Sequence, residues 1–116
     1  LHAAGIDVEL FESVVEIKEL GVGINILPHA TRELTELGLL DELAATAIET
    51  RALRYHTQYG HHIITEPHGL AAGYTWPQFS IHRRNLVMIL AKAARERIGA
   101  DHVHTGHHLD GFSQDG

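Results

Sequence analysis

The sequence predicts an α/β fold, and three observations along the chain indicate it. A strand-like segment at 7–11 follows a glycine that ends a helical turn. Two segments with apolar residues at helical spacing end at Gly38 and Gly99. Strand-forming residues at 51–57 and 61–67 flank a short turn. The resulting order of helix, strand, helices, hairpin, helix and strands is typical of mixed α/β domains.

The first elements are short. Residues 1–4 are predicted to form the last turn of a helix that stops at Gly5. Residues 7–11 follow as a strand, with Val8 and Leu10 expected to be buried. The stretch from Ser13 to Asn25 is expected to be a loop that contains two glycines.

Two helices and a hairpin come next. Pro28 suits a first helical turn, because proline lacks the amide hydrogen that such a position leaves unpaired. Leucines and an alanine follow at helical spacing until Gly38, and a second short helix is predicted at 39–45. Residues 51–57 and 61–67 then read as the two strands of the hairpin.

The rest of the chain begins with a loop at 68–78 and a short extended segment at 79–82. An amphipathic helix is predicted from Arg83 to the stop at Gly99, because apolar residues recur at helical spacing. Two short strands, at 102–105 and 108–112, are expected to close the chain.

Composition narrows the class of protein. The 116 residues suffice for one small domain, and the formal net charge of -6 argues against nucleic acid or an anionic membrane surface as a partner. No apolar run approaches the length of a membrane span. The absence of cysteine excludes disulfides and thiolate metal sites, and it is compatible with a cytoplasmic location. Oligomeric state cannot be read from the sequence.

Glu12 stands at the end of the first predicted strand. In dinucleotide-binding βαβ units an acid at this place binds ribose hydroxyls, roughly 20 residues after a glycine-rich turn. Counting back from Glu12 passes the first residue, so that turn is expected upstream of Leu1. A surface acid at a strand end is the alternative.

Two further segments are candidates for ligand contacts. In the stretch "ELGVGIN", Gly21 and Gly23 either allow a ligand to approach the backbone or simply make a tight turn. In "SIHRRNL", Arg83 and Arg84 stand at a helix start, where the helix dipole disfavours cations. They either bind phosphate or flavin oxygens or form a solvated pair.

The 11 histidines, densest in "HVHTGHH", raise the possibility of a metal site. The sequence has no H-E-x-x-H motif, and no carboxylate stands at a fixed spacing from these histidines. Exposed histidines on an edge strand and turn are the better interpretation, and no metal site is predicted. No nucleophile elbow or catalytic triad pattern is found, so no catalytic residue is assigned.

The stretches "HAAGIDVELFES", "LGVGINILP" and "PQFSIHRRNL" resemble the FAD-dependent aromatic hydroxylases, which are single-component flavoprotein monooxygenases. The resemblance extends over essentially the whole chain. It implies part of a Rossmann-like FAD-binding domain, a parallel sheet with helices, that carries an antiparallel β-hairpin insertion. The whole of 1–116 would be a partial FAD-binding domain that lacks the N-terminal glycine-rich turn and the later "GD" region.

The resemblance also implies roles for single residues. Glu12 would bind the ribose of the FAD adenosine half, with Ser13 beside it through its backbone. Val22 and Gly23 would lie along the flavin side, and Arg83 would reach toward FAD. In addition, Leu109, in the second closing strand, would meet the adenine through backbone groups. His82 receives no role, and Arg84 departs from the glycine common in close relatives, which leaves the local contact open.

The implied chemistry is hydroxylation of an aromatic or heteroaromatic substrate through a flavin C4a-hydroperoxide, with O2 and with electrons from NADH or NADPH. The 116-residue chain alone is expected to be inactive. The alternative is a stand-alone α/β binding or assembly module in which the nucleotide site is vestigial.

Overall fold

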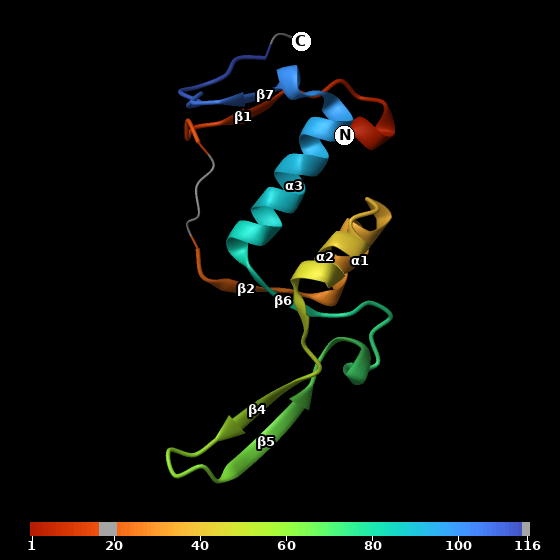
Figure 1. The fold of residues 1–116 in the computed structure, drawn as a ribbon, viewed down its shortest axis with the longest axis vertical. Helices are drawn as coiled ribbons and strands as arrows, with labels where there is room; N and C mark the ends of the chain where they lie inside the picture. The colour runs from red at the N-terminus through yellow and green to blue at the C-terminus, as the bar shows by residue number, and fades with distance from the viewer. Residues whose placement is uncertain (17–20, 115–116) are drawn as a thin grey trace. The chain divides into compact units, whose positions relative to one another are not determined.

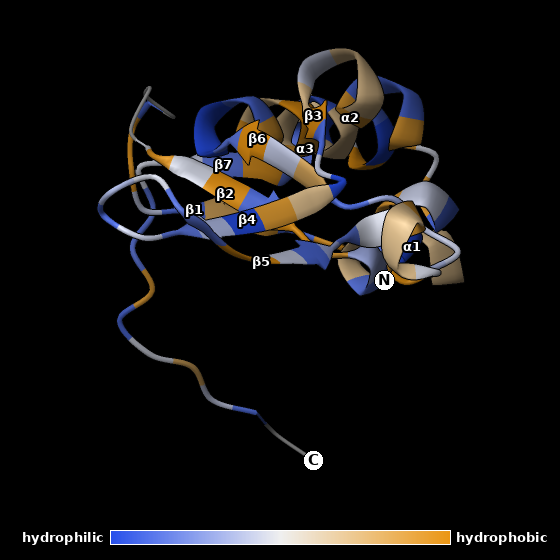
Figure 2. Ribbon diagram, turned by 90° about the horizontal axis from the view of Figure 1, so that it is seen from below, coloured by the Kyte–Doolittle hydropathy of each residue, from blue (hydrophilic) through white to orange (hydrophobic). Residues whose placement is uncertain are grey.

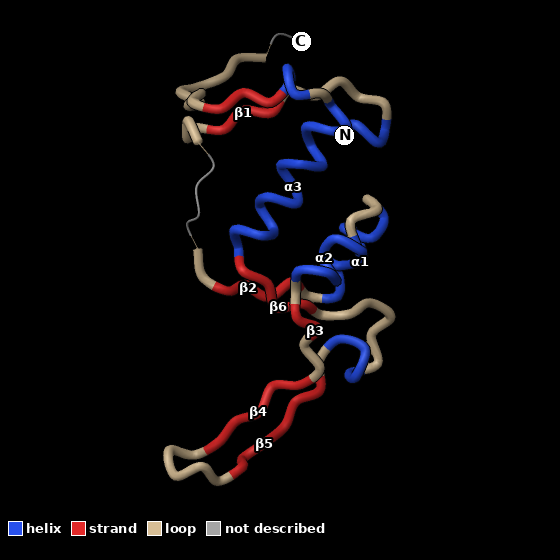
Figure 3. The backbone as a smooth tube through the Cα atoms, in the orientation of Figure 1, coloured by secondary structure: helices blue, strands red, loops and turns tan. Residues whose placement is uncertain are grey.

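The computed structural model describes residues 1–16 and 21–114 (Figures 1 and 3). The chain folds into two compact units. One consists of Leu1–Leu20 and Leu90–Gly116, and the other is Gly21–Ile89. Both helices and strands are present, which confirms the predicted α/β fold class.

The unit formed by the two chain ends contains a short parallel pair of strands. Strand β1 (Leu10–Glu12) pairs with β7 (Val103–Thr105), and Glu12 lies opposite Thr105. Two 3₁₀ turns, η1 (His2–Ala4) and η3 (Ala100–His102), precede these strands. Because the strands are parallel, their carboxyl ends meet at the same edge.

Three predictions for this unit need correction. The first strand begins at Leu10 and not at residue 7, since its partner β7 offers only three residues for pairing. Leu10 is exposed rather than buried. No strand forms at 108–112, and Leu109 therefore lies in irregular chain. The helical turn ending at Gly5, which has a φ of 75°, is as predicted.

The second unit is built on a three-stranded antiparallel sheet in the order β2 (Gly23–Ile26), β6 (Phe79–His82) and β3 (Ile48–Glu49). Ile26 pairs with Phe79, and both side chains are buried. The alternation of apolar and polar residues along β2 and β6 can be followed in Figure 2. The prediction of a loop through residue 25 is therefore wrong, because the alternating residues of 23–26 pair with β6.

Two helices follow β2. Helix α1 (Pro28–Glu36) has the proline in its first turn, and Gly38 follows its end with a φ of 69°. Helix α2 (Leu40–Thr46) buries Leu43 completely. Both helices agree with the predictions, since proline and glycine favour these two positions for simple backbone reasons.

The predicted hairpin is present as β4 (Ala52–His56) and β5 (His62–Pro67). All residues of both strands are exposed. Helix α3 (Arg83–Ile98) begins in this unit and ends at Gly99 in the other, as the sequence predicts. Among the residues that the structure describes, no helix has the length and apolar character needed to cross a membrane.

The loop predicted at 68–78 contains a 3₁₀ turn, η2 (Gly69–Ala72). Gly69 is buried and has a φ of 55°, and a Cβ atom placed on it would lie 2.6 Å from the backbone nitrogen of Gln78. Only glycine satisfies both the conformation and the space. This close contact fixes the position of Gln78 immediately before β6.

We predict that Gly69→Ala destabilises the protein more than Gly73→Ala does. Gly73, at the end of the same turn, has a φ of 86° but open space around it. Gly73→Ala therefore tests the backbone strain alone and should cost about 1 kcal/mol. Gly69→Ala adds the clash and should cost about 2 kcal/mol or more. Urea unfolding of both variants measures the difference, and equal losses would show that the backbone at Gln78 moves away freely.

Candidate functional site

The carboxylate of Glu12 is held by the chain that follows it. Its Oε1 atom accepts hydrogen bonds from the Ser13 hydroxyl at 3.1 Å and from the Val14 amide at 3.0 Å. The Val14 amide, and then the Ser13 hydroxyl, lower the pKa of Glu12 below its ordinary value. Glu12 is thus ionised at neutral pH.

The segment after β7 lies against the segment after β1. The His107 amide donates to the carbonyl of Glu12 at 3.0 Å, and the Gly106 amide donates to the carbonyl of Val14 at 2.9 Å. Gly106 has a φ of 73°, and a Cβ atom on it would lie 3.4 Å from the Val15 side chain. These contacts bring the two chain segments together at the carboxyl edge of the parallel pair.

A pocket of about 670 Å³ opens at this edge, lined by Phe11, Glu12, Ser13, His107, His108 and Leu109. The ring of Phe11 stacks on that of His104, with the centroids 4.8 Å apart. The structure therefore brings together three residues predicted to bind the cofactor, namely Glu12, Ser13 and Leu109. Leu109 reaches the pocket from irregular chain and not from a strand.

The other three predicted residues meet in the second unit. The Arg83 amide donates to the carbonyl of Val22 at 3.1 Å, and Gly23 is in register with His82. A Cβ atom on Gly21 would lie 3.0 Å from the Cβ atom of Arg83, whereas one on Gly23 would have no atom within 4 Å. Packing therefore explains the glycine at position 21, and it leaves open space beside the one at 23.

The backbone amides of both arginines at the start of α3 have hydrogen-bond partners. The Arg83 amide donates to the carbonyl of Val22, and the Arg84 amide donates to Nδ1 of His82 at 3.3 Å. First-turn amides of a helix otherwise lack partners, so these two contacts define where α3 begins. They also place the Arg83 side chain beside the backbone of residues 21–23.

The histidine-rich segment has a carboxylate partner that the sequence analysis missed. Glu9 contacts Nδ1 of His102 at 2.7 Å and Nε2 of His104 at 2.6 Å. The hydrogen bond to His104, followed by that to His102, lowers the pKa of Glu9. Glu9 is nearly a hundred positions away in sequence, and no spacing pattern reveals such a contact. Within the described ranges, no group of three or more His, Asp or Glu side chains is arranged to hold a metal ion.

Sequence reasoning also missed Gly21 as the glycine in closest contact, and it missed Phe11, His107 and His108 as pocket residues. The G-x-G pattern indicated that a glycine here is in close contact, but it did not show which of the two glycines it is. The pocket residues flank the assigned Glu12 and Leu109, so proximity along the chain was the available signal.

No protein-family model matches the chain. Among solved structures, the fold is similar to the tetrameric form of 2-methyl-3-hydroxypyridine-5-carboxylic acid oxygenase, with a TM-score of 0.74 and 23% identity. That match covers 91% of this chain and 26% of the oxygenase. At this identity the likeness establishes the fold alone, and it is the fold of part of an oxygenase.

Curated relatives extend the likeness to sequence. The chain is 52% identical to phenazine 1,6-dicarboxylic acid hydroxylase PhzS of Lysobacter antibioticus, over 97% of this chain and 28% of that protein. It is 35% identical to 3-amino-4-hydroxybenzoate 2-monooxygenase of Streptomyces cremeus, over 74% of this chain and 23% of that protein. An FAD-dependent monooxygenase of Beauveria bassiana (strain ARSEF 2860) is 29% identical over 92% of this chain and 26% of its own length.

These matches confirm the resemblance to the FAD-dependent aromatic hydroxylases. The chain spans about a quarter of the length of the curated relatives that it matches. Similarity to enzymes along nearly the full chain favours a segment of a monooxygenase over a stand-alone binding or assembly module.

We predict that the pKa of Glu12 lies below that of an unstructured glutamate, and that Ser13→Ala raises it part of the way back. Thr46→Ala, which removes a hydroxyl bonded only to the carbonyl of Glu42, should leave it unchanged. NMR titration of the side-chain carboxyl carbons measures all three proteins.

The same shift sets the sign of a pH effect on stability. Because folding lowers the pKa of Glu12, its contribution is fully present above the unfolded-state pKa, and it is lost as pH falls through the lower folded-state value. An ordinary pKa at Glu12 in the folded protein would contradict the hydrogen bonds from Ser13 and Val14.

Proposed function

We propose that the protein containing this chain is an FAD-dependent monooxygenase that uses NADH or NADPH and O2 to hydroxylate an aromatic or heteroaromatic acid. The observation that carries the proposal is the ionised Glu12 at the carboxyl end of a parallel strand, beside a pocket. The sequence likeness to aromatic hydroxylases supports it. Two of those relatives are named for carboxylated aromatic substrates, which is why an acid is proposed.

The pocket beside Glu12 fits the adenosine half of FAD. The carboxylate of Glu12 has acceptor capacity for ribose hydroxyls, and the hydrogen bonds to its Oε1 atom keep it oriented. Ser13 would contribute through its backbone, and Leu109 would meet the adenine through its own backbone. The exposed, largely apolar wall formed by Phe11 and Leu109 suits the flat face of a base.

The cluster at the start of α3 fits another part of the same cofactor. Gly23 leaves open space along the backbone, so a ligand can approach it closely. Arg83 has a planar guanidinium with five donors, which suits phosphate or flavin oxygens. Val22 would lie along the flavin side. FAD, when bound, would supply the redox and oxygen chemistry, and the role of these residues would be to bind and orient it.

We predict that Glu12→Gln, in the complete protein, weakens FAD binding roughly ten- to a hundredfold. The substitution keeps the shape but removes the charged acceptor for the ribose hydroxyls. Fluorescence titration of the apoprotein with FAD measures the affinity, with far-UV circular dichroism as the check on folding. An unchanged affinity would show that Glu12 is a surface acid, which was the alternative interpretation of its position.

We also predict that Arg83→Ala weakens FAD binding more than Arg84→Ala does. Both arginines stand in the first turn of α3, so any general effect of the helix dipole is similar at the two positions. The Arg83 side chain lies nearest the space beside Gly21, whereas Arg84 approaches it with its backbone nitrogen. The same titration compares the two variants, and equal small effects would mean that the pair is only a solvated surface.

A further inference from the structure

The unit Gly21–Ile89 contains a second pocket, of about 430 Å³, that none of the residues assigned to FAD lines. It lies between the first turn of α1 and the chain that joins β5 to β6. Its apolar wall includes the rings of Tyr74 and Trp76 together with Pro28 and Pro67. A cavity of this size lined by flat rings suits a small planar ligand.

Gln78 supplies a polar group to this pocket. Its side chain is 4% exposed, and its Oε1 atom lies 3.0 Å from Nδ1 of His68. Its amide nitrogen has no partner among the described residues. Among the described residues no side-chain nitrogen or oxygen sealed from solvent lacks a hydrogen bond, so this nitrogen is not sealed, and Gln78 lines the pocket. The close contact with Gly69 keeps Gln78 in place.

A second donor comes from the first turn of α1. The amides of Ala30 and Thr31 both donate to the carbonyl of Leu27, and Pro28 has no amide hydrogen. The His29 amide is then the one without a partner among the described residues of this turn. No side chain caps the helix and no acid stands in its first turn, so the positive end of the helix dipole is uncompensated there.

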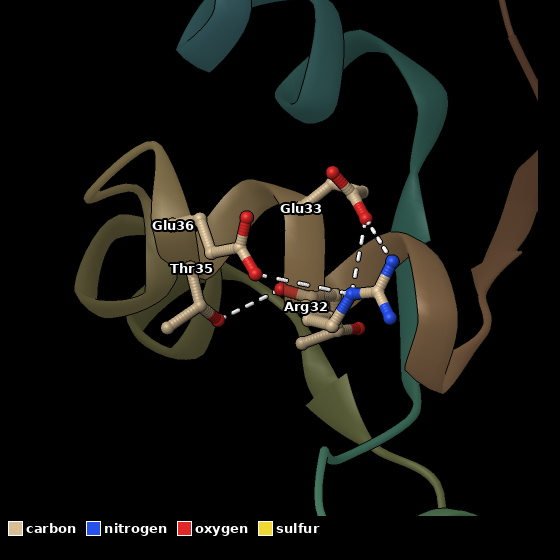
Figure 4. A network of polar contacts seen from close by, with 5 residues as sticks. Arg32, Glu33, Thr35 and Glu36 are labelled. Carbon is tan, nitrogen blue, oxygen red and sulfur yellow. Dashed lines mark hydrogen bonds and ion pairs between the residues drawn. The ribbon is translucent and has the colours of Figure 1, made fainter.

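No carboxylate lines this pocket, although the chain as a whole is acidic. Arg32 pairs with Glu33 and Glu36, as Figure 4 shows, so its charge is already matched by two acids that do not line the pocket. The pair with Glu33 raises the pKa of Arg32, which therefore stays charged. The donors at Gln78 and at the His29 amide, in a pocket that no carboxylate lines, favour an anion as the ligand.

We propose that this pocket binds the carboxylated ring of a planar aromatic acid. The ring would lie against Trp76 and Tyr74, and the carboxylate would accept hydrogen bonds from the Gln78 amide and the first-turn amide of His29. The inference deepens the proposed function and rests on it for the identity of the ligand as substrate. The binding chemistry itself depends only on residues of this unit.

Trp76 makes the proposal testable, because it is the only tryptophan of the chain and it lines the pocket. The probe is benzoate, titrated against the complete protein with excitation of tryptophan. Trp76→Phe identifies the part of the signal that comes from this side chain. Benzamide keeps the ring without the charge, and cyclohexanecarboxylate keeps the charge without the flat ring. We expect saturable quenching by benzoate, and binding at least roughly tenfold weaker for each analogue.

Variants refine the test. Gln78→Leu removes the amide at similar size and should weaken benzoate binding roughly tenfold. Tyr59→Ala, at the exposed hairpin turn outside the pocket, is the matched control and should leave it unchanged. The ligand comparison uses the unaltered protein, so it remains decisive if Gln78→Leu fails to fold.

Two outcomes separate this inference from the proposed function. FAD binding without saturable benzoate binding, or equal binding of benzoate and benzamide, would overturn the pocket assignment. Benzoate binding that is selective and depends on Gln78, in a protein that does not bind FAD, would support the assignment and count against the proposed function alone.

Discussion

The antiparallel pairing of β2 with β6 is the interaction on which the second unit depends. Four consecutive residue pairs join the strands, and they contribute Ile26, Phe79 and Ile81 to the apolar core of that unit. Beyond one end of the paired strands, the carbonyl of Val22 accepts a hydrogen bond from the amide of Arg83, the first residue of α3. Beyond the other end, Leu27 precedes α1 and Gln78 precedes β6. The positions of Arg83 at the start of α3 and of Gln78 before β6 therefore both follow from the register of β2 with β6.

That register explains why a shift by one residue would be so damaging. Side chains alternate between the two faces of a strand, so a slip would expose Ile26 and Phe79 and would bury polar neighbours. It would also separate Gly21 from Arg83, whose contact is specific to the observed alignment. Core packing and the geometry of the candidate site are therefore specified together.

Much of this architecture could be predicted from local sequence. Pro28 and Gly38 mark the limits of α1 because proline and glycine have strong backbone preferences, and the hairpin follows from its strand-forming residues and turn. Elements set by partners distant in sequence were harder to predict. Residues 23–25 were predicted to be part of a glycine-containing loop, yet 23–26 pair with β6 as a strand.

Some residues of the candidate site could also be predicted from local sequence and others could not. Glu12 was singled out because ligands bind at strand ends of α/β sheets, and Arg83 because its position opposes the helix dipole. The contacts of Glu9 with His102 and His104 join residues far apart in sequence, so no local pattern could predict them. Leu109 and Glu12 line the same pocket, but the strand predicted at 108–112 does not form.

The hairpin formed by β4 and β5 has a consequence for dynamics. Both of its faces are exposed, and an isolated two-stranded ribbon is only marginally stable in water. Its base is tied by the amide of His68, which donates to the carbonyl of Arg51 at 2.8 Å, and by the amide of Thr50, which donates to the carbonyl of Gln78. Amide hydrogens should therefore exchange quickly with solvent near Tyr59 and progressively more slowly toward the base, so that opening of the ribbon begins at its tip.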